Sequence, residues 1–228
     1  RRLQAEIGGE IVYFCHDSDH DPRETRTTLH HRTTGEPALL NFTFENRWQR
    51  KFSPLYCKRI PSDWQERTLL QLPNYIERPA IELFRRTSAA TVADFCLAMY
   101  RGMGLLDGVR VVRSSDRELR KAACDIEDFF VDIPHQGEIV RARFAQGEFS
   151  LHEGGDRYLS LAGAPFDKEQ ISPTRDTRFR WMQSVLHCTH YVTGMGEQAY
   201  IRKEEAPEVL FYTRQEIDRS DEAYADVR

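Results

Sequence analysis

The sequence predicts an α/β fold in which helices cover both faces of a mostly parallel sheet, with small β-rich insertions. Two stretches alternate helix and strand as such folds require: helix, glycine turn and strand over residues 1–15, then helix, strand and helix over residues 91–130. The composition is typical of a globular domain, because 40% of the residues are apolar and 30% are charged. We expect one domain over residues 1–214 and an acidic C-terminal tail over residues 215–228.

The N-terminal part begins with the end of a helix over residues 1–7. Gly8-Gly9 stop this helix before an apolar strand that runs from Glu10 to Cys15. Residues 25–60 then alternate and are rich in aromatic residues, which predicts a β-rich excursion with strands over 25–30 and 38–44.

Helical spacing dominates the middle of the chain. Ser62 is a candidate cap for a helix over residues 63–70, and a short helix over 80–86 precedes a better one over 91–103. In that helix apolar residues recur at intervals of three and four, which predicts one buried face. A strand over 105–112 and a helix over 117–130 follow.

The C-terminal part contains a second β-rich excursion near residues 135–160. There a hairpin is predicted around the turn Gln146-Gly147. A helix over 176–186, a strand over 187–193, a glycine-containing turn that opens a helix, and a last strand over 208–214 complete the prediction.

Charge and composition exclude several classes of partner. The formal net charge of −4 gives no basic surface for nucleic acid over the whole chain, and no stretch is apolar enough to suggest a membrane span. Five cysteines lie far apart without a CxxC pair, so we expect reduced thiols and a cytoplasmic location. The expected partner is a small molecule.

Two histidines and several acidic residues follow the first strand directly. They are His16, Asp17, Asp19, His20, Asp21 and Glu24, all within nine residues. A structural turn does not need so many ionisable groups, although Asp21-Pro22 could simply start a helix. In a parallel sheet, this position would be the ligand-binding edge.

Two kinds of chemistry remain open for this cluster. His16, Asp19, His20 and Asp21 could bind zinc, manganese or iron through nitrogen and oxygen ligands. Alternatively, His20 could transfer a proton or stabilise charge, while Asp19 and Asp21 orient it and hold a substrate hydroxyl or amine. The sequence does not separate these alternatives.

Two further groups of residues lie near the C-terminus. Gly194 and Gly196 could let backbone amides approach an anion at a helix start, although a plain turn explains them equally well. Glu197 would repel a phosphate and could bind an amine or a ribose hydroxyl instead. Arg180 and Gln183 would share a helix face that could meet an anionic substrate.

Five motifs follow one another along the chain. They are Ser18–Glu24, Leu105–Val112, Ser115–Lys121, Ile171–Thr174 with Arg180 and Gln183, and Tyr191–Tyr200. In this order they resemble the cysteine-adding enzyme, or cysteine ligase, of bacillithiol biosynthesis. The resemblance covers about residues 1–214 and departs from the family at Thr174, where an asparagine is expected.

The resemblance implies a Rossmann-like domain of the nucleotidylyltransferase superfamily and a reaction that joins cysteine to the amine of an aminosugar. It also implies an adenine nucleotide as cofactor and a homodimer. Asp19, His20, Asp21 and Glu24 would lie beside the sugar or nucleotide. The second wall of the same cleft would be formed by Gly194, Gly196, Glu197 and Tyr200, with Arg180 and Gln183 leading into it.

We therefore expect a ligase-like or nucleotidyl-transfer enzyme in which His20, Arg180 and Glu197 line one pocket. A metal-dependent hydrolase built on residues 16–21 is the first alternative. The second is a binding domain that kept the fold and lost the chemistry.

Overall fold

The computed structural model describes residues 1–30, 37–72, 76 and 78–214, and these form two compact units. Of the described residues, the first unit comprises Arg1–Ser114 and Pro134–Val140, and the second comprises Ser115–Ile133 and residues 141–214. The predicted acidic tail, residues 215–228, lies outside the described residues. Of the helices in the described ranges, none combines the length and apolar character needed to cross a bilayer.

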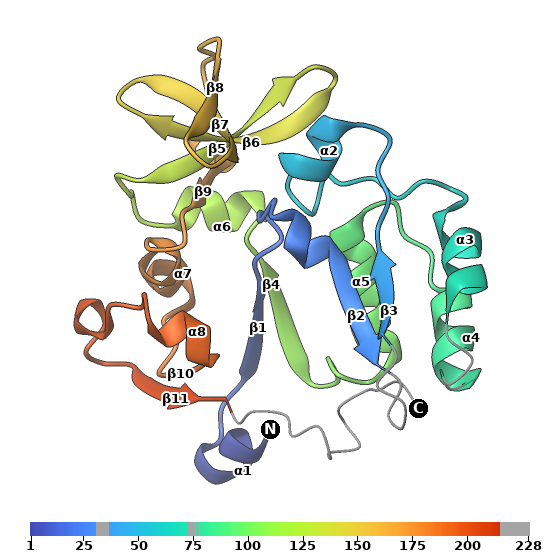
Figure 1. The fold of residues 1–228 in the computed structure, drawn as a ribbon. Helices are drawn as coiled ribbons and strands as arrows, with labels where there is room; N and C mark the ends of the chain where they lie inside the picture. Colours follow the sequence, from blue (N-terminus) through green and yellow to red (C-terminus); the bar gives the residue numbers. More distant parts are fainter. Residues whose placement is uncertain (31–36, 73–75, 77, 215–228) are drawn as a thin grey trace. The chain divides into compact units, whose positions relative to one another are not determined.

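The prediction of a mostly parallel, Rossmann-like sheet is wrong. The largest sheet has five strands in the order β8-β7-β6-β5-β9, and its β5–β9, β6–β7 and β7–β8 pairs run antiparallel (Figure 1). Tight turns with positive φ at Gln136-Gly137 and Gln146-Gly147 join successive strands, and such turns can connect only antiparallel neighbours. The strands are Phe129–His135 (β5), Glu138–Ala145 (β6), Glu148–Gly154 (β7), Arg157–Leu161 (β8) and Ile171–Pro173 (β9).

Among the described residues of the first unit, parallel pairing is confined to two strands. β1 (Ile11–Cys15) pairs with β4 (Val109–Arg113) (Figure 1). Cys15 lies opposite Arg113 at the carboxyl end of the pair. The helix α1 (Arg2–Ile7) precedes β1 and ends at Gly8, whose φ of 75° confirms the predicted glycine stop. The predicted strand over residues 105–112 is shorter at its start, because positive φ at Gly104 and Gly108 makes a turn there.

The predicted β-rich excursion after β1 is confirmed as an antiparallel pair. β2 (Arg26–His30) pairs with β3 (Pro37–Asn41), and the short 3-10 helix η1 (Pro22–Thr25) leads into it. Four helices follow: α2 (Arg47–Lys51), α3 (Trp64–Gln71), α4 (Arg78–Arg86) and α5 (Val92–Gly102). The last three correspond to the helices predicted over 63–70, 80–86 and 91–103.

Aromatic packing forms the core of the first unit. The Trp64 ring stacks on Phe42 with centroids 4.3 Å apart and meets Phe95 edge-on at 5.3 Å. Phe84 of α4 packs on both Trp64 and Phe95, so one cluster joins α3, α4 and α5. Each buried aromatic side chain contributes roughly 2–3 kcal/mol to this packing.

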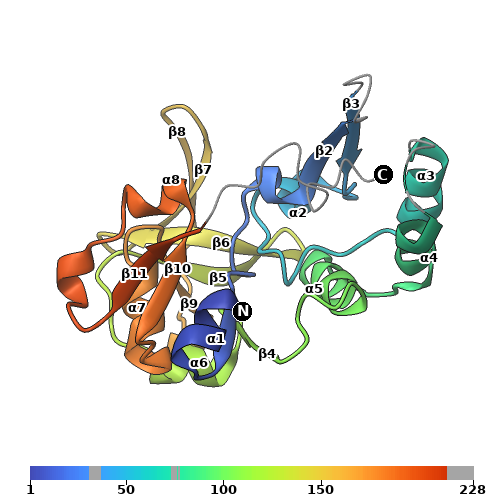
Figure 2. The ribbon, with the colours of Figure 1, turned by 90° about the horizontal axis from the view of Figure 1, so that it is seen from below.

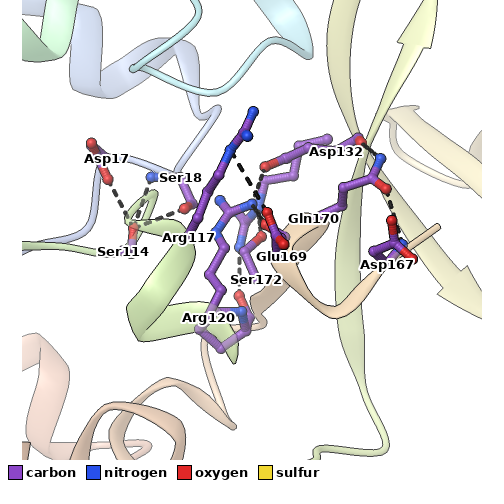
Figure 3. Close-up of polar contacts among 12 residues, drawn as sticks. Asp17, Ser18, Ser114, Arg117, Arg120, Asp132, Asp167, Glu169, Gln170 and Ser172 are labelled. Atoms are coloured by element: carbon purple, nitrogen blue, oxygen red, sulfur yellow. Dashed lines mark hydrogen bonds and ion pairs between the residues drawn. The ribbon is translucent and has the colours of Figure 1, made fainter. Parts of the chain in front are cut away.

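The helix predicted over residues 117–130 is wrong beyond its first turns. α6 (Arg117–Ala122) ends as Ala123 turns to an extended conformation, and β5 begins at Phe129. The run Phe129-Phe130-Val131 favours a strand, and it pairs with β9 in the sheet. Arg120 of α6 donates to Asp132 of β5 at 2.7 Å, and this buried ion pair anchors the short helix (Figure 3).

The second unit also holds a small parallel sheet. β10 (His190–Thr193) pairs with β11 (Leu210–Thr213), as the predicted strands over 187–193 and 208–214 indicate (Figure 2). The helix predicted over 176–186 is confirmed as α7 (Arg178–Leu186). The remaining elements are the four-residue helix α8 (Met195–Gln198) and the 3-10 helices η2 (Lys168–Gln170) and η3 (Lys203–Glu205).

Candidate functional site

The loop formed by residues 16–21 follows β1 and is held by backbone hydrogen bonds. Leu55 N donates to Asp19 O at 2.8 Å, and Tyr56 N donates to Asp17 O at 3.2 Å. Within the loop, Asp19 N donates to His16 O at 3.1 Å. The loop therefore has a defined path along residues 55–56.

Buried side chains fix the same loop from the carboxyl end of β4. Asp17 and Ser18 are fully buried, with 0% exposure. Ser114 Oγ accepts from Ser18 N at 2.9 Å and lies 3.1 Å from Asp17 Oδ1 (Figure 3). Arg113 Nε donates to Asp17 Oδ2 at 2.6 Å, so the buried carboxylate has a cationic partner.

Arg113 also joins this loop to the start of α5. Its Nη1 donates to Asp94 Oδ1 at 2.6 Å, and Thr91 Oγ1 donates to Asp94 Oδ2 at 2.8 Å. Although burial opposes the charged form, the hydrogen bonds from Thr91 and Arg113 lower the pKa of Asp94. Asp17, Arg113 and Asp94 thus form a charged bridge between the loop and the helix. We call these three residues the carboxylate bridge.

The side chains of the predicted cluster differ in burial. Asp17 is fully buried and holds the loop in place, whereas His16, Asp19, His20 and Asp21 are each half-buried. Asp19 Oδ1 accepts from Asp21 N at 2.9 Å, which shapes the turn between the two carboxylates. The half-buried groups are therefore the ones that a substrate could reach.

Asp21 has a local partner that the sequence prediction did not include. Its carboxylate accepts from Arg23 N and Arg23 Nε, both at 2.8 Å, and so caps η1. The hydrogen bond from the Arg23 side chain lowers the pKa of Asp21. Glu24, predicted to contact substrate, is exposed in the first turn of η1.

Lys58 is a buried cation close to the loop that sequence reasoning missed. Its side chain is fully buried, and Nζ donates to Gln49 O at 2.5 Å and Arg50 O at 2.9 Å in the last turn of α2. Burial lowers the pKa of Lys58 to about 8, although the charges of Asp19 and Asp21 act in the opposite direction. No sequence pattern indicates that Lys58 is buried, because two adjacent basic residues such as Lys58 and Arg59 usually lie on the solvent-exposed surface.

The metal alternative gains no support from this geometry. Within the described ranges, no three His, Cys, Asp or Glu side chains are placed to hold one metal ion. A metal site built on the loop would require at least three such ligands at short distance.

In the second unit, Arg178 links two of the predicted residues. Tyr191 OH donates to Glu197 Oε1 at 2.9 Å, and Arg178 Nη2 donates to Tyr200 OH at 2.7 Å. Arg178 Nη2 also lies 3.8 Å from Glu197 Oε1. Glu197 and Tyr200, which the resemblance places on one wall, are therefore neighbours, joined by an arginine that sequence reasoning did not select.

Arg180 and Gln183, two further predicted residues of the second unit, differ in their exposure to solvent. Arg180 is exposed on α7, whereas Gln183 is buried, so they do not share an environment. Gln183 Oε1 accepts from Cys188 N at 2.9 Å and Nε2 donates to Cys188 O at 3.0 Å, which closes the end of α7. Gln183 therefore has a structural role.

Neither predicted glycine has a conformation that requires glycine. Gly194 has a φ of −76° and precedes α8, and Gly196 lies inside this helix. A side chain at Gly196 would meet no heavy atom within 4 Å, and one at Gly194 would make only an ordinary contact with Arg214 Nη2 at 4.0 Å. Neither position therefore shows a close approach of backbone to another group.

Comparison with known proteins adds no identification. No protein-family model matches the sequence, and no curated protein matches it significantly. His20 belongs to the first unit, and Arg180 and Glu197 belong to the second. A pocket shared by these three residues therefore stays a prediction.

Proposed function

We propose that the protein is a ligase-like enzyme that joins cysteine to an aminosugar-type substrate at the loop of residues 16–21. The observation that carries this proposal is the carboxylate bridge, which fixes a loop containing two half-buried histidines and two half-buried carboxylates. The order of sequence motifs supports the same reaction class.

A polar turn does not require a buried ion pair such as the one in the carboxylate bridge. A fully buried carboxylate such as Asp17 costs several kcal/mol in lost hydration, which Arg113 and Ser114 offset only when their geometry is maintained. Active sites commonly use such supporting contacts to hold reacting groups in position. Here the supported groups are Asp19 and His20.

The chemistry of amide formation matches these residue types. An amine attacks an activated carboxyl group only in its neutral form, so a base must accept the ammonium proton. The imidazole of His20 is suited to this role, because histidine changes its charge near neutral pH. The carboxylate of Asp19 can hold the ammonium group before it loses this proton.

Isothermal titration with cysteine and with an aminosugar such as glucosamine tests the proposal. We expect both ligands to bind the wild-type protein, and His20→Ala or Asp19→Ala to weaken aminosugar binding about tenfold or more, which corresponds to about 1.4 kcal/mol. The matched controls are His152→Ala and Asp156→Ala, two exposed residues of the second unit.

Two results would contradict the proposal. The first is a wild-type protein that gives no binding heat with either ligand. The second is equal aminosugar affinity in His20→Ala and His152→Ala, which would leave the loop without a role in binding and favour a domain that lost its chemistry.

A further inference from the structure

Helix starts that follow parallel strands are the usual phosphate sites of α/β proteins. There the free backbone amides and the helix dipole attract an anion. The adenine nucleotide that the sequence resemblance implies would place its phosphates at such a position. The described residues offer three of these positions, after β1, β4 and β10.

After β1, the carboxylate of Asp21 already occupies the anion position. It accepts from Arg23 N at 2.8 Å, and the Arg23 guanidinium donates to the same carboxylate through Nε and Nη2 at 2.8 and 2.5 Å. The backbone amide and the cationic side chain that could hold a phosphate are therefore both bound to Asp21.

The helix after β4 repeats this arrangement. Asp116 Oδ1 accepts from Leu119 N at 3.0 Å as the cap of α6, and Glu118 adds a second acidic residue to the first turn. After β10, the first turn of α8 contains Glu197, whose carboxylate is held by Tyr191. The three helices are also short, with four, six and four residues.

From this we infer that the helix starts after β1, β4 and β10 reject phosphate, and that Asp21 is the specificity-determining residue at the loop of residues 16–21. Its carboxylate fills the place of the anion, and two like charges a few ångströms apart repel each other. The implied nucleotide therefore does not fit at these positions.

Rejection of phosphate at the loop limits how the carboxyl substrate can be activated, a consequence that rests on the proposed function. If amide formation at this loop uses no nucleotide, another reaction supplies the carboxyl substrate in activated form, for instance as a thioester. The amine nitrogen then forms a bond to the carbonyl carbon, the carbon–sulfur bond breaks, and the thiolate leaves. The proton released by the amine goes to the base and then to the thiolate.

A pyrophosphate titration followed by backbone amide NMR of the full chain tests the rejection of phosphate. In the wild type we expect the Arg23, Leu119 and Glu197 amides to show no saturable shift up to about 10 mM pyrophosphate. Asp21→Gly keeps an acceptable cap residue but frees the Arg23 amide and guanidinium. In this variant the resonance of the Arg23 amide should shift saturably. The affinity for pyrophosphate should be at least about fivefold higher than the upper limit set by the wild-type titration.

The control is Asp156→Gly, which removes one exposed carboxylate elsewhere and should leave all three amides unchanged. Saturable shifts of Arg23, Leu119 or Glu197 in the wild type would overturn the inference, and so would an Asp21→Gly protein without any gain. Because the titration contains neither cysteine nor aminosugar, its outcome is separate from that of the proposed function.

Discussion

Arg113 is the residue on which the geometry of the loop depends most. It contacts the fully buried Asp17 and the half-buried Asp94 with one donor each, both at 2.6 Å. The sequence showed the acidic cluster but gave no reason to pair it with an arginine about a hundred positions later. Such a pairing follows from the β1–β4 register, which places Cys15 opposite Arg113.

Removal of this arginine should be costly. Arg113→Met leaves the buried Asp17 carboxylate without its cation, and we expect the free energy of unfolding in urea to fall by about 2–4 kcal/mol. Arg67→Met, which breaks an exposed ion pair with Asp63, should cost less than about 1 kcal/mol. Equal losses in the two variants would show that the carboxylate bridge does not hold the loop.

Lys58 should make stability depend on pH in the alkaline range. Its pKa is about 8 in the folded protein and 10.5 ordinarily, so between these values the unfolded chain binds a proton that the folded protein has lost. Stability from this group therefore rises from pH 8 to 10.5, by up to about 3 kcal/mol, and is absent below pH 8.

The measurement is the wild-type free energy of unfolding minus that of Lys58→Met, at several pH values. The difference is needed because burial also raises the pKa of Cys15 and of Cys96. The contributions of these two thiols to the free energy of unfolding fall as pH rises. The exposed Lys203→Met serves as control and should keep the wild-type slope. A difference that stays flat from pH 8 to 10.5 would contradict this account of Lys58.

At the scale of elements, the sequence predicted those helices and turns that depend on neighbouring residues alone. The helix α5 was predictable from apolar spacing, and the Gln146-Gly147 turn from its glycine. The helix predicted over 117–130 failed at its end because the run Phe129-Phe130-Val131 favours a strand. Residues 129–131 pair with β9, a partner about forty positions away that no local pattern reveals.

The end of α7 offers a prediction at this scale. His187 closes the helix with φ 48° and ψ 45°, a left-handed conformation that favours glycine. His187→Gly should therefore raise the free energy of unfolding by about 0.5–1 kcal/mol, measured in urea. His190→Gly, in strand β10, should lower it. A less stable His187→Gly protein would mean that the histidine side chain contributes contacts that outweigh the strain.

At the scale of the whole molecule, the fold class was not predictable from these patterns. Alternation of helix and strand suggested one parallel sheet, yet strand direction depends on which strands meet. Hairpin turns made residues 129–161 an antiparallel meander, which is the main sheet and not an insertion. The cluster was correctly located directly after β1, because this position depends on local chain order alone. The parallel direction of β1 comes from its pairing with the distant strand β4.

The central claim is that the loop of residues 16–21 binds the substrate amine. It is tested most directly by two-dimensional NMR of the histidine rings during titration with an aminosugar. The account predicts that the His20 ring resonances shift saturably, while those of the exposed His152 stay in place. Saturation of the protein with aminosugar while the His20 resonances stay unmoved would contradict it.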